Sequence, residues 1–266
     1  MEIVTNCVAI VLTVLYGVLL SGEFRALRER QDPSLLATRW IGVTVAIHLI
    51  ALIVRGIEVG ACPVASRWET LSLLALLIVT MHLVLAGISR DRSTLIFGIA
   101  VTFLLQLGSA SFSLGESITD PQRIDSISSL HAFTAWIGVA GVSTAGIHGV
   151  LWLLLKRSIK SGQFGVLFHR LSSLESLSRL IRLATVIATV SLVITMVSAV
   201  FLGEVLTWST GPVTLISLAL AILFGVLALV PRSTGTVTAW RAWFSVTGLG
   251  GVVFIIVWII RFGPHA

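Results

Sequence analysis

Charged side chains are scarce in this chain of 266 residues: Asp, Glu, Lys and Arg make up 11% of it, while 56% of the residues are hydrophobic. In a typical water-soluble domain about a quarter of the residues are charged. The scarcity of charge therefore argues against an ordinary soluble globular protein. It indicates instead that the chain lies in a lipid bilayer.

Cysteine is equally rare, with only Cys7 and Cys62. They do not form a C-x-x-C motif, so the sequence gives no sign of a thiol redox centre or a zinc site. Both are expected toward the outer side of the membrane, which leaves a disulfide between them open. Phosphate-binding loops, paired carboxylates and a nucleophile beside a base are also missing from the sequence, so it names no catalytic residue.

Long hydrophobic runs, by contrast, recur along the whole sequence and are separated by short polar loops. A helix needs about 20 mostly apolar residues to cross roughly 30 Å of hydrocarbon. We therefore expect an all-α, polytopic membrane bundle that forms a single domain over residues 1–266. The eight predicted spans are Ile3–Leu20, Thr38–Ile57, Glu69–Ser89, Thr94–Phe112, Ser128–Leu155, Leu183–Leu206, Pro212–Val230 and Ala242–Ile260.

The distribution of basic residues predicts the orientation, because cytoplasmic loops carry the excess of Lys and Arg. If the N-terminus is outside, the inner loops hold all 18 basic residues except Arg55, Arg67, Arg123 and Arg261. We predict that both termini are external and that the protein is a multi-pass protein of the cell inner (cytoplasmic) membrane. Membrane lipid is then an expected partner. Nucleic acid is not, since no basic stripe with interleaved aromatic residues is present.

The longest inner loop contains the stretch "SLESLSRLIRL", with apolar residues at Leu174, Leu177, Leu180 and Ile181. This spacing is compatible with a short amphipathic helix on the membrane surface. The simpler interpretation, which we favour, is that the stretch leads directly into the sixth span.

Histidines are the best chemical lead, because an ionisable group inside a span is rare unless it has a partner or a function. His48, His82, His131 and His148 lie in or at the ends of predicted spans, whereas His169 falls in an inner loop. A neutral imidazole can also be satisfied by one hydrogen bond between helices. Each of the four is therefore a candidate cofactor ligand or a residue of the helix packing.

Between His131 and His148 the small residues Gly138, Gly141 and Ala145 recur at helical spacing. Such a stripe lets a flat macrocycle approach the backbone, or it lets another helix pack closely. The two histidines are about 25 Å apart along one helix, so they cannot bind the same iron.

Depth in the membrane suggests other pairings. His131 lies near the outer end of the fifth span and His265 just beyond the outer end of the eighth, so these two could share an outer site. His82 and His148 both fall in the inner half of their spans. No histidine partner is evident at the depth of His48.

Several stretches resemble the cytochrome c assembly membrane proteins, the family of the system II cytochrome c synthase and its HemX-like relatives. "RGIEVGACPVASRWETLSLLALL" is similar to the family segment G-x-F-P-x-x-N-x-Y-E-S-L, with matches at Gly60, Pro63, Glu69 and Leu71. The resemblance extends over about residues 40–266. It includes "LHAFTAWIGVAGVSTAGIHGVLWLL", which is similar to the family helix that opens with an external histidine. It also includes "SLESLSRLIRLATVIATVSLVITMVSAVFLGEV", similar to the helix that leads into the tryptophan-rich motif, and "FIIVWIIRFGPHA", similar to the terminal segment.

The resemblance implies haem, tentatively of b type, with His131 and His265 at the positions of the family's external iron ligands. Trp208 matches the first part of the haem-presenting WWD motif. The rest of that motif is degenerate, because Thr210, Gly211 and Thr214 replace its second tryptophan, aspartate and acidic end. A protein with this departure is not expected to be a competent haem lyase.

We therefore expect a haem-binding or haem-handling membrane protein of cytochrome c biogenesis. Its candidate ligands are His131 and His265, with His48, His82 and His148 as further candidates. A partner from cytochrome c assembly would accompany this function. The alternative is a non-catalytic structural or assembly subunit of a larger respiratory or photosynthetic electron transfer complex.

Overall fold

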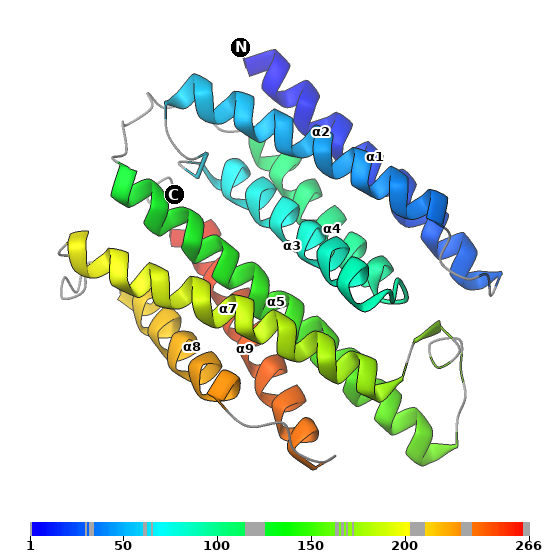
Figure 1. Ribbon diagram of the computed structural model, residues 1–266. Helices are drawn as coiled ribbons and strands as arrows, with labels where there is room; N and C mark the ends of the chain where they lie inside the picture. The colour runs from blue at the N-terminus through cyan, green and yellow to red at the C-terminus, as the bar shows by residue number, and fades with distance from the viewer. Residues whose placement is uncertain are drawn as a thin grey trace. The chain divides into compact units, whose positions relative to one another are not determined.

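The computed structural model of the chain is all-helical over the residues that it describes (Figure 1). Eight of its helices are long and apolar enough to cross a membrane, which confirms the predicted multi-pass helical bundle. The structure describes residues 2–29, 31, 35–60, 63–64, 66–114, 126–162, 165, 168, 170–171, 173–202, 211–229 and 236–262.

The helices form two compact units, an N-terminal unit of Met1–Asp125 and a C-terminal unit of Ser126–Ala266. The expectation of one domain over the whole chain stays a prediction, and each unit is described here by itself. The N-terminal unit contains α1 (Glu2–Arg28), α2 (Leu35–Val59), α3 (Arg67–Ser89) and α4 (Leu95–Ser113). The C-terminal unit contains α5 (Ser126–Ser161), α7 (Leu174–Leu202), α8 (Gly211–Leu229) and α9 (Thr236–Phe262).

In the N-terminal unit every helix contacts two others, in the order α1, α2, α3, α4 and back to α1. This closed ring is a four-helix bundle. The fully buried side chains of Tyr16, Ile41, Val79 and Ile99, one from each helix, meet in its core. Tyr16 is the single tyrosine of the sequence, and its hydroxyl requires a polar partner in this apolar setting.

In the C-terminal unit α5 packs against α7 and α9, and α8 packs against the same two helices. At 36 residues α5 is about 54 Å long, so it exceeds the hydrocarbon thickness. It continues past the predicted end at Leu155 through Lys156 and Arg157, and it stops where Gly162 adopts a φ of 66°. The left-handed conformation that glycine tolerates is the usual way to end a helix.

The amphipathic stretch before the sixth span is part of α7, which runs without interruption from Leu174 to Leu202. Leu177, Leu180 and Ile181 are buried within the C-terminal unit. The interpretation of this stretch as a lead-in to the span is therefore confirmed.

The predicted orientation gives a direct test. A reporter enzyme fused after Ala266 should behave as external, and one inserted near Lys160 as cytoplasmic, because basic loops stay inside. Alkaline phosphatase and green fluorescent protein fusions measure the two locations with opposite activity. The reverse pattern at both positions would overturn the predicted orientation.

Candidate functional site

His131 lies in the first turns of α5 and is held by α7. Its Nδ1 is 3.1 Å from the backbone oxygen of Thr195 and 3.2 Å from the hydroxyl of Ser198. Thr195 also bonds α5 directly, because its hydroxyl lies 3.0 Å from that of Thr134. A backbone carbonyl and a hydroxyl, both from α7, thus hold the imidazole in a largely apolar bundle.

The carbonyl of Thr195 settles which ring nitrogen of His131 carries the proton. A carbonyl oxygen only accepts hydrogen bonds, so Nδ1 must donate. In a neutral imidazole the other nitrogen, Nε2, then carries the lone pair that could bind a metal. A histidine whose second nitrogen donates to a backbone carbonyl is the arrangement that usually orients a metal-ligating imidazole.

Helix packing accounts for Gly138 and Gly141, the two glycines of the stripe between His131 and His148. A Cβ atom on Gly138 would lie 2.8 Å from the side chain of Leu192, and one on Gly141 would lie 2.9 Å from the Cα atom of Ala188. Both neighbours belong to α7. The stripe therefore lets α5 and α7 approach closely, as small residues do in membrane bundles.

His148 is completely buried in the C-terminal unit, and its Nδ1 is 2.7 Å from the backbone oxygen of Thr144 on the same helix. His82 in the N-terminal unit has the same local pattern, with Nδ1 3.0 Å from the oxygen of Ile78. Its ring fills the space above Gly98 of α4, where an added Cβ atom would lie 2.5 Å from His82 Cγ. These two histidines belong to different units, and an inner haem shared by them stays a prediction.

His48 is the centre of a buried hydrogen-bonded chain in the N-terminal unit. The hydroxyl of Tyr16 is 3.0 Å from His48 Nδ1, and His48 Nε2 is 2.9 Å from the hydroxyl of Ser72. Ser72 in turn donates to Gln106 Oε1 over 3.1 Å. The chain links α1, α2, α3 and α4, and both ring nitrogens of His48 are used within it.

The hydrogen bonds of this chain all run in one direction. Ser72 has a single hydroxyl proton, which it gives to Gln106, so it must accept from Nε2 of His48. Nδ1 of the neutral ring is then an acceptor for the Tyr16 hydroxyl. The direction is therefore from Tyr16 through His48 and Ser72 to Gln106, and in such a chain each bond polarises the next.

A partly buried ion pair lies at the end of the bundle where α2 stops and α3 starts. Arg55 Nε is 2.6 Å from Glu69 Oε1, and the guanidinium lies 5.4 Å from the ring centre of Trp68. The second oxygen of Glu69 accepts from the backbone N–H of Ser66, while the Ser66 hydroxyl accepts from the N–H of Glu69. This capping box starts α3, so one carboxylate both caps a helix and neutralises an arginine.

The structure thus places four of the six predicted site residues. His131 is oriented with Nε2 available, and His48, His82 and His148 are held by hydrogen bonds inside their own units. His265 and Trp208 lie outside the described residues, as does His169. Among the described residues there is no group of three or more His, Cys, Asp or Glu side chains able to hold a metal ion.

Compared with family models, curated proteins and solved structures, the chain gives no match. The resemblance to cytochrome c assembly proteins stays a prediction that depends on its motifs. Glu69, one of the residues that carries it, has the structural role described above.

Sequence reasoning missed the partners of His48. Tyr16, Ser72 and Gln106 are distant from it along the chain, and the depth argument considered only histidines. A useful signal was present, because a lone tyrosine, a histidine and a glutamine in separate apolar spans each need a polar partner.

Proposed function

We propose that this chain is a haem-binding or haem-handling protein of the cytoplasmic membrane, with His131 as an axial donor to the iron. The observation that supports this best is the hydrogen bond from His131 Nδ1 to the carbonyl of Thr195, which leaves Nε2 as a lone-pair donor. The neutral imidazole is an ordinary axial ligand of haem iron. His265 is proposed as the second ligand on the strength of the motif resemblance.

In this proposal the protein residues bind and orient the group. The hydroxyl of Ser198 and the backbone carbonyl of Thr195 hold the imidazole of His131. Bound haem, tentatively of b type, would supply a redox-active iron. Because the presentation motif is degenerate at Thr210, Gly211 and Thr214, the role is handling or binding of haem rather than its attachment to cytochrome c.

The proposal is tested by haem content. We expect the purified protein to show a Soret band and His131→Ala to lose most of it, because no neighbouring side chain in "SISSLHAF" is an iron donor of comparable strength. Imidazole added to His131→Ala should restore part of the band by occupying the vacated position. Absorbance per mole of protein measures both effects.

Two matched variants separate ligation from general disturbance. Thr134→Val removes a hydroxyl from the same polar cluster but leaves His131 in place, so the Soret band should persist. His169 falls in a loop that the sequence predicts to be cytoplasmic, so His169→Ala should also leave the Soret band unchanged. A wild-type protein without a Soret band, or equal loss in Thr134→Val and His131→Ala, would contradict the proposal.

The second candidate function is a non-catalytic structural or assembly subunit of a larger respiratory or photosynthetic complex. It is favoured by Gly138 and Gly141, which serve the packing of α5 against α7. Co-purification of a stoichiometric partner complex with a haem-free chain would support this candidate over the first.

A further inference from the structure

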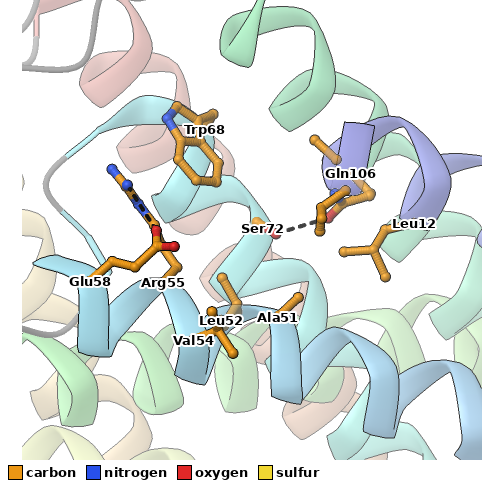
Figure 2. Close-up of a pocket in the computed structure, with 11 residues that line it drawn as sticks. Leu12, Ala51, Leu52, Val54, Arg55, Glu58, Trp68, Ser72 and Gln106 are labelled. Atoms are coloured by element: carbon orange, nitrogen blue, oxygen red, sulfur yellow. Dashed lines mark hydrogen bonds and ion pairs between the residues drawn. The ribbon is translucent and has the colours of Figure 1, made fainter. Parts of the chain in front are cut away.

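The N-terminal unit contains a cavity of about 220 Å³ lined by residues of all four of its helices. Its walls include Leu12, Ala51, Leu52 and Trp68 (Figure 2). A buried apolar cavity of about 150 Å³ holds one benzene molecule. The space is therefore sufficient for a head group of one ring with small substituents.

The polar groups of the cavity lie at two places. Figure 2 shows Gln106 beyond Ser72 on one side and Arg55 with Glu58 on the other, with the apolar residues Leu52 and Val54 below them. A ligand that spans this space meets polar side chains at both ends and hydrocarbon between them. Such a pattern suits an apolar ring with oxygen atoms at opposite positions.

Gln106 lines the cavity and carries an unmatched hydrogen-bond donor. Its side chain is completely buried, Oε1 accepts from Ser72, and Nε2 has no hydrogen-bond partner among the described residues. Because the chain from Tyr16 runs in one direction, its last group is the amide N–H of Gln106. Buried donors of this kind are normally paired, so the cavity calls for an acceptor oxygen.

The charges at the other end exclude an anion as the preferred ligand. Arg55 is the basic residue that lines the cavity, and it is shared between Glu69 at 2.6 Å and Glu58 at 3.6 Å. One positive charge against two carboxylates leaves no surplus for a lipid phosphate or a fatty-acid carboxylate. A neutral ligand carrying acceptor oxygens fits this balance.

The rim of the cavity indicates the route of entry. Val8 of α1 and Val54 of α2 line it and are 38% and 50% exposed. Exposed valines on spanning helices are suited to contact with hydrocarbon. A lipid-soluble ligand could therefore enter between α1 and α2.

We propose that this cavity binds the head group of a lipid-soluble quinone. One carbonyl oxygen accepts from Nε2 of Gln106, the ring lies among Leu12, Ala51 and Leu52, and the opposite oxygen faces Arg55. The site is independent of haem at His131, since every residue that lines it belongs to the N-terminal unit.

The test is equilibrium partition of decylubiquinone between nanodiscs that contain the full chain and empty nanodiscs. We expect saturable binding of one molecule per chain. Decylbenzene, which has the same tail and a ring without carbonyl groups, should bind at least about tenfold more weakly, because it cannot accept a hydrogen bond.

Three variants locate the site. Gln106→Leu removes the amide donor and should weaken binding by about tenfold, and Ala51→Phe should abolish it by filling the cavity. The matched control is Thr102→Val, which removes a buried hydroxyl one turn away on α4 that bonds to Ala75 and does not line the cavity. Its binding should stay within about twofold of the wild type.

Unfolding midpoints in the same nanodiscs identify variants that fail to fold, and only folded variants are compared. If Gln106→Leu does not fold, the comparison of Ala51→Phe with Thr102→Val decides. Three results would overturn the proposal. They are the absence of saturable quinone binding, equal binding of decylbenzene and decylubiquinone, and undiminished quinone binding by folded Gln106→Leu and Ala51→Phe. The first of these would show a cavity that holds water or lipid only.

Discussion

Replacing Glu69 with alanine should lower the free energy of unfolding of the N-terminal unit by about 3–5 kcal/mol, because it removes the buried carboxylate that bonds the largely buried guanidinium of Arg55. The side chain of Glu69 is 1% exposed and that of Arg55 is 13% exposed, so water cannot replace the lost carboxylate at low cost. The same change removes the capping box at the start of α3. Unfolding in mixed micelles, followed by circular dichroism, measures the loss.

Glu58 provides the matched control for this prediction. It also faces Arg55, but at 3.6 Å and with 39% of its side chain exposed. Exposed pairs contribute little, so Glu58→Ala should cost less than about 1 kcal/mol.

A double variant separates the charge from the packing. Arg55→Met combined with Glu69→Leu removes both charges, and it should recover much of the stability that Glu69→Ala loses. If Glu69→Ala lowered the free energy of unfolding no more than Glu58→Ala does, the ion pair of Arg55 and Glu69 would not stabilise this end of the bundle.

Much of the fold could be predicted because hydrophobic runs report directly on burial in lipid. Each predicted span overlaps one of the eight long apolar helices. The predicted spans differ from the helices of the structure mainly in where they begin and end. Helix α5 continues past the last apolar residues because Lys156, Arg157 and Lys160 are good helix formers, and it stops only at Gly162. Apolar runs mark the membrane, whereas helices end where the backbone requires a special residue.

The candidate sites were less predictable, because their partners come from helices whose order in space the sequence does not reveal. The bond from His131 to Thr195 joins residues 64 positions apart, and the one from Tyr16 to His48 joins residues 32 apart. Polar residues in apolar spans could be recognised singly, but their pairing depends on which helices are neighbours. The small residues near His131 show the same ambiguity, since a stripe that admits a helix could equally admit a cofactor.

The second large effect is expected for Gly146, which lies at the contact between α5 and α9. A Cβ atom on Gly146 would lie 2.5 Å from the Cβ atom of Leu249 and 2.8 Å from the backbone oxygen of Ser245. Backbone and Cβ atoms cannot move aside by a change of rotamer, so the two helices would have to separate. Since α5 is the helix on which α7 and α9 both pack, the whole C-terminal unit should lose stability.

We expect Gly146→Leu to lower the free energy of unfolding of the C-terminal unit by about 3 kcal/mol, at the upper end of the cost of overpacking. Gly250→Leu on α9 is the matched control, because an added Cβ atom there has nothing within 4 Å. In that open position leucine is a better helix former than glycine, so the control should be neutral or stabilising by up to about 1 kcal/mol. Denaturant unfolding of both variants in the same detergent gives the comparison. Equal stability of the two would mean that α5 and α9 do not pack through Gly146, and the assignment of this glycine to helix packing would then fail.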